Sequence, residues 1–147
     1  VFGQQPAFSV TPALSRSASG RIKQLLAISR AHIRRVLDLG RRDGIPVLLI
    51  WVPHPLEMFG DGGPSNTLNL FEKARKMLRY ESARAPDVRF MDTASILPRD
   101  EKWRRRSNTL YLVSDYHFNF AGNRWFAELI KGGVVNFLLN PPAGNLS

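Results

Sequence analysis

Three long stretches of the chain repeat apolar residues with the period of an α-helix. The first covers residues 19–39, where apolar side chains recur every three or four positions and basic side chains fill many of the others. Ser19 is a suitable N-cap for this helix, and Gly40 is a suitable stop signal. Residues 66–84 and 121–139 follow the same period. The pattern therefore predicts three long helices.

Two apolar runs between these helices predict strands. Val47 to Val52 is apolar at every position, which is typical of a strand that a parallel sheet buries on both faces. Residues 88–91, which are apolar except for Arg89, form a shorter run that ends at Asp92. The opening residues, 1–3, resemble the end of a third strand whose beginning is missing. Strands that alternate with helices predict an α/β domain with a parallel sheet, which we expect to be incomplete on its N-terminal side.

The remaining segments are predicted to be loops. Residues 56–65 are rich in glycine and follow the first apolar strand, and residues 98–108 are mostly polar. The tail, residues 141–147, is expected to be frayed. We therefore interpret residues 1–147 as a single α/β domain that forms the C-terminal part of a larger one.

The composition excludes several classes of protein. With 44% hydrophobic and 22% charged residues, the chain of 147 residues is typical of a globular domain rather than a disordered one. It contains no cysteine, which excludes disulfides, thiolate nucleophiles and cysteine-based metal sites. We predict no metal and no cofactor, because the histidines and carboxylates do not have the spacing of metal ligands.

The net charge of +9 favours anionic partners. Acidic polysaccharide, membrane headgroups, nucleic acid and an acidic protein surface would all fit this charge. The candidate contact is a dense basic run around Trp103, formed by Lys102, Arg104, Arg105 and Arg106. Basic runs with one aromatic residue are common on ordinary solvated surfaces, so nucleic acid is the disfavoured partner.

The clearest chemical signal comes from Asp115 and His117, which lie two positions apart just before the third helix. A carboxylate beside an imidazole can fix its tautomer and stabilise the imidazolium, as a general base acting on a hydroxyl nucleophile requires. Asn119 and Gly122 then predict a helix start that is packed closely under this turn. The alternative is structural: Asp115 would cap the helix, and His117 would be a half-buried polar residue.

Three further candidates stay open. His54 stands between two prolines at the end of the first apolar strand, where it would either line a site or shape the turn. Ser65 and Ser114 are internal candidates for a nucleophile, but neither lies in a sharp strand-to-helix turn of the kind that exposes such serines.

Most of the chain resembles the C-terminal part of the SGNH (GDSL-like) hydrolase superfamily in its order of elements and motifs. Residues 115–119, Asp-Tyr-His-Phe-Asn, followed by Gly122, are similar to the family's Asp/His block before its last helix. The family more often has two residues between Asp and His, and the Asp-x-His form recurs in its polysaccharide O-acetyltransferase branches. The Gly-Ile-Pro approach to the apolar strand, residues 44–46, and its end at Pro53 also match. The resemblance implies a three-layer α/β/α, flavodoxin-like fold.

The same resemblance implies a serine ester hydrolase or O-acyltransferase that acts on an O-acylated substrate, such as a carbohydrate. His117 would act as the general base, and Asp115 would orient its ring. Gly3, Gln5 and His54 would lie at the oxyanion or substrate site. Gln5 stands where the family has Asn, and the family's Gly-Asp-Ser nucleophile block has no match in the sequence. The serine would therefore come from outside this chain, which alone is expected to be inactive. An extracytoplasmic location follows from the resemblance alone.

A second interpretation is a catalytically silent SGNH-like domain that serves as a binding or scaffold subunit of a larger complex. The missing serine, Gln5 and the net charge of +9 favour it. Under both interpretations, a missing N-terminal segment or a partner chain is expected to complete the sheet.

Overall fold

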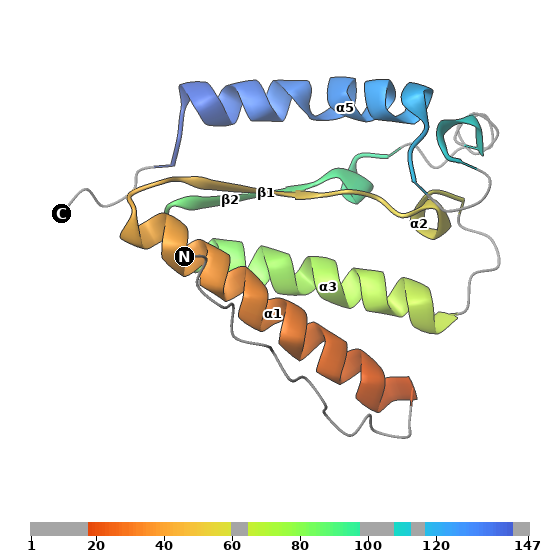
Figure 1. Cartoon of the computed structure of the whole chain (residues 1–147), viewed down its shortest axis with the longest axis horizontal. Coiled ribbons are helices and arrows are strands. Elements are labelled where there is room, and N and C mark those ends of the chain that lie inside the picture. The colour runs from red at the N-terminus through yellow and green to blue at the C-terminus, as the bar shows by residue number, and fades with distance from the viewer. Residues whose placement is uncertain (1–17, 60–64, 98–107, 113–116, 143–147) are drawn as a thin grey trace, which may run out of the picture.

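The computed structural model describes residues 18–59, 65–97, 108–112 and 117–142 (Figure 1). In chain order, its elements are α1 (Ala18–Arg42), β1 (Val47–Trp51), α2 (Pro55–Phe59), α3 (Ser65–Ala83), β2 (Val88–Asp92), the 3₁₀ helices η1 (Thr93–Ser95) and η2 (Asn108–Leu110), and α5 (Phe120–Leu139). The architecture of these residues is mixed α/β, and mostly helical around a small parallel sheet.

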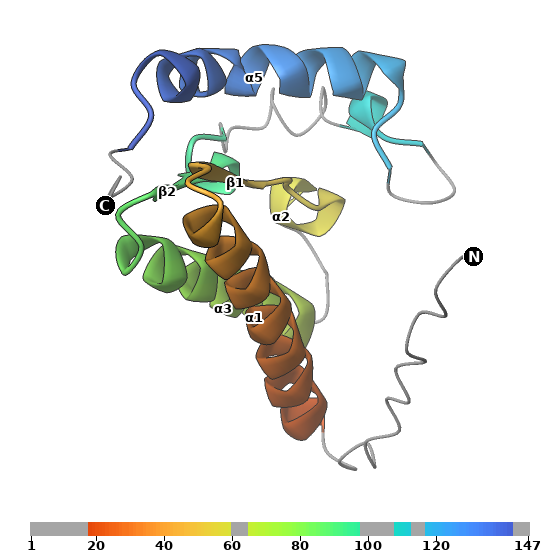
Figure 2. The ribbon, with the colours of Figure 1, turned by 60° about the vertical axis from the view of Figure 1, so that its left-hand side comes forward.

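β1 and β2 form the sheet within the described residues. They pair in parallel from Val47 opposite Val88 to Trp51 opposite Asp92, and the Val47 N–H donates to the Asp87 carbonyl at 3.0 Å. α3 is the crossover that such a parallel pair requires. Figures 1 and 2 show α5 along one face of the sheet and α1 and α3 along the other. The prediction of an α/β class with a parallel sheet is confirmed at this level.

Two apolar clusters join the helices to the sheet. The cluster on the α1 side of the sheet consists of buried Leu37, Ala85 and Val88 with Ile33, Val47 and Leu49 around them. The other cluster connects α2, η1, η2 and α5; its buried members are Met58, Ala94, Leu97, Leu110 and Tyr111, with Trp51, Phe118, Trp125 and Leu129 packed against them. Removal of this apolar surface from water is the main favourable contribution to folding.

An ion-pair cluster fastens α3 to α1. The Glu81 carboxylate is 6% exposed, and it accepts hydrogen bonds from Arg30 and, at 2.9 Å, from the Arg34 Nε. These contacts, with the hydrogen bond from Arg34 as the largest, hold the pKa of Glu81 below its ordinary value. Part of the basic face of α1 therefore pairs with a buried acid.

α5 approaches its neighbours closely at two glycines. A Cβ atom at Gly133 would lie 1.8 Å from the Met91 Cε of β2, and one at Gly122 would lie 2.0 Å from the Leu110 carbonyl oxygen. At Gly122 the obstacle is backbone, which cannot move aside as a flexible side chain can. Hydrogen is therefore the side chain that lets the first turn of α5 pack against η2.

The sequence predicted that Gly40 ends the first helix, but the structure differs. α1 continues to Arg42, and the chain turns at Gly44, whose φ of 65° is a conformation that other residues rarely adopt. Gly40 is instead buried against β1, where a Cβ atom would lie 2.6 Å from a methyl group of Val47. The glycine serves close packing between α1 and the sheet.

Two other expectations also differ from the structure. The segment after β1, predicted to be a loop, begins with the short helix α2, whose first residue is Pro55. β1 was predicted to be buried on both faces; helices lie along both faces (Figure 2), but all five of its residues are partly rather than fully buried. Residues 1–3, predicted to be a strand end, and residues 143–147 of the predicted frayed tail (141–147) lie outside the described residues. None of the described helices is both long enough and apolar enough to cross a membrane.

Candidate active site

The strand ends and the segment that contains His117 lie at one end of the molecule. β1 runs into His54 and α2, β2 runs into η1, and residues 117–119 lead into α5 at the same end (Figure 1). The carboxyl ends of parallel strands are where open α/β sheets hold their ligands. Two predicted site residues, His54 and His117, are therefore at the end of the sheet where a site is expected.

Tyr111 anchors the His117 segment to the end of β1. Its ring is buried, and its hydroxyl donates a hydrogen bond of 2.9 Å to the Pro53 carbonyl. The Met58 Sδ lies 2.6 Å from the same hydroxyl, but the carbonyl is the stronger acceptor for its one proton. Burial raises the pKa of the Tyr111 hydroxyl far above its ordinary value. The hydroxyl therefore stays protonated, and stays a donor, at physiological pH.

The chain folds back on itself between Tyr111 and Phe118. These residues form an antiparallel bridge, and their ring centroids lie 4.6 Å apart. The Leu112 N–H donates to the His117 carbonyl at 2.8 Å. This pairing fixes the backbone of His117, whose side chain is exposed. Asp115 lies outside the described residues, so its contact with His117 stays a prediction.

Asn119 caps the N-terminus of α5. Its Oδ1 accepts the Gly122 N–H at 2.9 Å, and its side-chain amide donates to the Thr109 carbonyl at 2.6 Å. The predicted helix start at Asn119 and Gly122 is confirmed. Asn119 is therefore the N-cap of α5.

His54 caps α2. Its Nδ1 accepts the Leu56 N–H at 3.2 Å, and the Glu57 Oε2 accepts the His54 backbone N–H at 3.1 Å. The two bonds resemble a capping box with histidine at the N-cap, except that the ring accepts the second rather than the third N–H of the helix. Desolvation by burial lowers the pKa of His54, although Glu57 opposes the shift. A neutral ring is the form that leaves Nδ1 free to accept. His54 thus shapes the turn, and its role at an oxyanion or substrate site stays a prediction.

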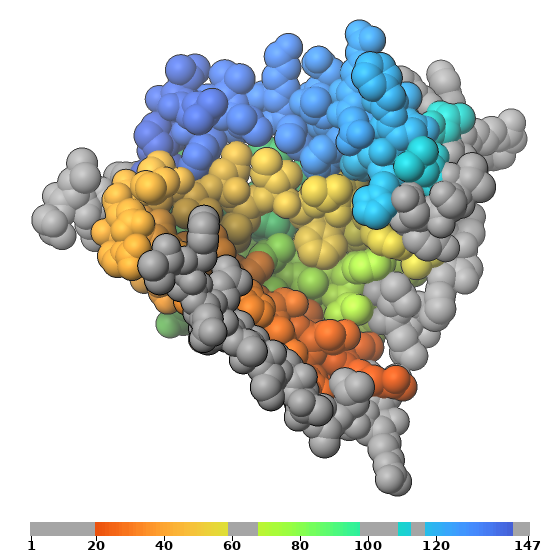
Figure 3. Space-filling model, viewed as in Figure 1, coloured from red at the N-terminus to blue at the C-terminus, as the bar shows by residue number. Residues whose placement is uncertain are grey.

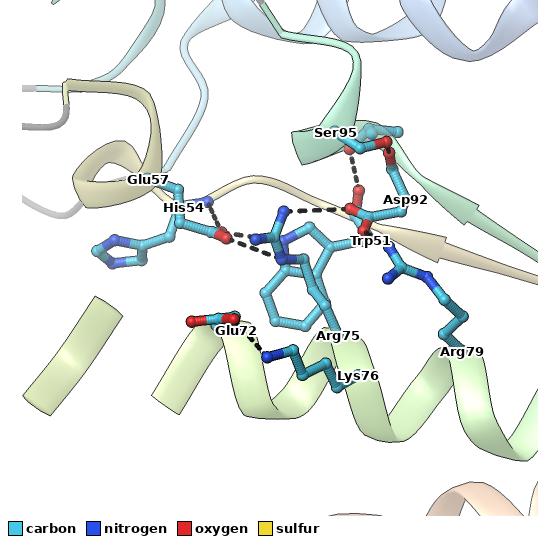
Figure 4. A network of polar contacts seen from close by, with 10 residues as sticks. Trp51, His54, Glu57, Glu72, Arg75, Lys76, Arg79, Asp92 and Ser95 are labelled. Atoms are coloured by element: carbon cyan, nitrogen blue, oxygen red, sulfur yellow. Dashed lines mark hydrogen bonds and ion pairs between the residues drawn. The ribbon is translucent and has the colours of Figure 1, made fainter. Parts of the chain in front are cut away.

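A charged network that the sequence did not predict lies beneath the strand ends (Figure 4). The Arg75 guanidinium of α3 stands between two carboxylates: its Nη1 lies 3.3 Å from the Asp92 Oδ1, and its Nε lies 3.5 Å from the Glu57 Oε1. The Arg79 Nη2 contacts the Asp92 Oδ2 at 2.7 Å. The spacing of Arg75 and Arg79 was the signal for this network in the sequence, because residues four positions apart lie on the same side of a helix.

The network has a structural role. The Glu57 and Asp92 side chains are 7% and 9% exposed, and buried carboxylates need compensation of this kind. Glu57 also accepts the Trp51 Nε1–H at 2.9 Å. The described residues contain no group of three histidines or carboxylates placed to hold a metal ion.

A cleft of about 470 Å³ lies beside the start of α5. It is lined by Thr109, Leu110, Ala121, Arg124, Trp125 and Glu128. Its walls come from η2 and the first turns of α5, the two elements that flank the His117 segment. The cleft offers an indole, a guanidinium and a carboxylate to a ligand.

Several predicted site residues lie outside the described part of the chain. They are Gly3, Gln5, Lys102, Arg104, Arg105, Arg106, Ser114 and Asp115. Ser65 is the first residue of α3. Comparison of the chain with protein-family models, curated proteins and solved structures gives no match.

Proposed function

We propose that the protein is part of a serine ester hydrolase or O-acyltransferase of SGNH type. The observation that carries this proposal is how the fold holds His117. The Tyr111–Phe118 bridge and the hydrogen bond from Tyr111 to Pro53 place its backbone at the carboxyl end of β1, and its side chain is exposed. A general base needs this combination of a fixed position and access to a substrate.

In the proposed reaction, His117 takes the proton of a serine hydroxyl while the serine oxygen attacks the ester carbonyl. The imidazolium then returns that proton to the leaving alcohol, and Asp115 keeps the ring in the required orientation. Water or a second alcohol, deprotonated by the same ring, releases the acyl group. The serine is supplied from outside residues 1–147.

The surroundings of the site support a carbohydrate ester as substrate. Trp125 in the cleft beside α5 offers an aromatic face, and Arg124 offers a positive charge for an anionic group. The arrangement of α5 on one face of the sheet and α1 and α3 on the other supports a three-layer fold of the flavodoxin-like kind (Figure 2).

Hydrolysis of an acetyl ester tests this proposal. The polypeptide from the complete reading frame is expected to cleave the ester, and His117→Ala to lower kcat by about 10²–10⁴. His32→Ala is the matched control, because His32 is an exposed histidine in the middle of α1; its kcat is expected to be unchanged. Equal activity of the two variants would exclude His117 as the base.

A binding or scaffold function is the second candidate, and the charge of one layer favours it. α1 and α3 carry eleven arginine and lysine residues against three acidic residues. A surface of this charge attracts anionic partners regardless of catalysis. If the complete polypeptide does not cleave the ester, the binding or scaffold function replaces the enzymatic one as the favoured candidate.

A further inference from the structure

One edge of β1 carries backbone groups that face away from β2. The Val47 N–H points to β2, where it donates to the Asp87 carbonyl. Successive residues of a strand direct their backbone groups to opposite sides, so those of Leu48 and Ile50 point to the other edge. Within the described residues, β2 is the strand next to β1, and this other edge has none.

β1 combines the sequence of a central strand with the exposure of an edge strand. All five of its residues are partly rather than fully buried, and Val52 just beyond it is 55% exposed. Figure 3 shows the yellow-orange atoms of this segment at the surface, between α5 and α1. Exposed edges are usually protected by charged residues, proline or a short strand. Residues 47–52 contain neither charge nor proline.

An exposed apolar stripe also runs along α1. Leu25, Ile28, Val36 and Leu39 recur at helical spacing and are 39–53% exposed. Successive residues of a helix are about 100° apart around its axis. Seen along α1, the residues that contact the sheet lie between two groups. The apolar stripe is on one side of them, and Arg30 and Arg34 are on the other. Because both arginines pair with Glu81 of α3, the stripe faces away from α3. It therefore lies on the side of the free edge of β1.

The handedness of crossovers tells which strand belongs at this edge. α1 and α3 lie on the same face of the sheet (Figures 1 and 2). Strand–helix–strand crossovers between parallel strands are right-handed in nearly all proteins. Two right-handed crossovers with their helices on one face step across the sheet in the same direction. A parallel strand that leads into α1 must then lie on the side of β1 opposite β2.

We propose that the polypeptide N-terminal to α1 pairs in parallel with the free edge of β1 and packs against the apolar stripe of α1. Seventeen residues precede α1, which is enough for a strand of about five residues and a connection. The pairing satisfies the outward backbone groups of Leu48 and Ile50 and covers the exposed side chains of both elements. It is a feature of the sheet and does not depend on the esterase reaction.

Other occupants fit this surface less well. α1 carries seven basic residues against one aspartate, so two copies joined through α1 would bring like charges together. A lipid surface or a nucleic acid would leave the outward N–H and C=O groups of Leu48 and Ile50 without the paired hydrogen bonds that a strand provides.

Hydrogen exchange of single amides tests the proposal. In the full chain, the Leu48 and Ile50 amides are expected to exchange as slowly as the Leu49 amide, which faces β2. Deletion of residues 1–12 is expected to speed exchange at Leu48 and Ile50 by about 100-fold or more. Leu49 should stay protected, which shows that β1 and β2 remain folded in the truncated chain.

Three results would overturn the proposal. The first is fast exchange at Leu48 and Ile50 in the full chain, and the second is protection that survives the deletion. The third is protection that depends on protein concentration, which would assign the edge to a second copy.

A pair of variants probes the α1 stripe independently. Leu25→Gln is expected to lower the Tm by about 4 °C or more in the full chain, because it buries an amide. Ala31→Gln, at another exposed position of the same helix but outside the stripe, should leave the Tm unchanged. Equal Tm values for the two variants would contradict a covered stripe.

Discussion

The carboxyl end of the sheet and the free edge of β1 differ in how fully the described residues satisfy them. At the carboxyl end, the Tyr111 hydroxyl, the His54 cap and the Arg75 ion pairs provide partners for the polar groups of three chain segments. Along the free edge, the residues of β1 are only partly buried, and no strand among the described residues pairs with its outward backbone groups.

This difference indicates which chain segments stabilise each of the two regions. The carboxyl end is built from segments that follow β1 and β2 in the chain, and the anchoring contacts named above lie within the described residues. The element proposed to complete the free edge precedes α1. Point substitutions are therefore expected to damage the carboxyl end, whereas the free edge responds to removal of a segment.

The largest effect is expected for Arg75→Met. The substitution leaves the Glu57 and Asp92 carboxylates buried without the guanidinium between them, and breaking a buried pair costs about 3–5 kcal/mol in the free energy of unfolding. Arg79→Met is the control, because the Arg79 side chain is 61% exposed; its cost should stay below about 1 kcal/mol. Urea denaturation measures both. Similar losses in the free energy of unfolding for Arg75→Met and Arg79→Met would show that the network is not buried.

Tyr111→Phe is expected to have an intermediate effect. It leaves the buried Pro53 carbonyl without its donor, which costs about 1–3 kcal/mol. Tyr80→Phe removes a hydroxyl from an exposed ring, and its cost should be within about 0.5 kcal/mol of zero. The two variants are compared by thermal unfolding. A Tyr111→Phe protein as stable as Tyr80→Phe would mean that this hydroxyl does not anchor the His117 segment.

The smallest effect is expected at His54 and depends on pH. His54→Ala should cost about 0.5–2 kcal/mol, the usual value of an N-cap, and His54→Asn should restore most of it. The folded-state pKa of His54 lies below the ordinary value of 6.5, so the unfolded chain binds the proton first. The stability contribution of the neutral ring is thus complete above that pH and falls as the pH drops below it.

Comparison of His54→Asn with the wild type isolates this pH dependence. The Tm of the wild type should fall more steeply than that of His54→Asn as the pH drops below the ordinary histidine pKa of 6.5. Parallel Tm profiles would show that the ring does not need to be neutral in the folded protein.

Periodicity and apolar runs were sufficient to predict the main elements. The helical period gave α1, α3 and α5 to within a few residues of their observed bounds, and the run from Val47 gave β1. α2 was not predicted because it has only five residues, too few for a period to show. Its capping signal, Glu57 three positions after His54, is present, but histidine is an uncommon N-cap.

The contacts of the candidate site could be predicted only where they are local. Asn119 and Gly122 lie three residues apart, and a helix start at these residues was predicted. The partners of Tyr111 and Arg75 lie 58 and 17 residues away in the chain. Such pairings depend on how the crossover and the last helix dock, which a single sequence does not reveal.

The central claim is that this chain provides the general base and that the nucleophile lies outside it. The most direct measurement is reaction with a fluorophosphonate ester, followed by mass spectrometry of the modified peptide. Residues 1–147 alone are predicted not to react, and the polypeptide of the complete reading frame is predicted to react at one serine that precedes residue 1. An adduct on Ser65 or Ser114, or no adduct on the complete polypeptide, would contradict the claim.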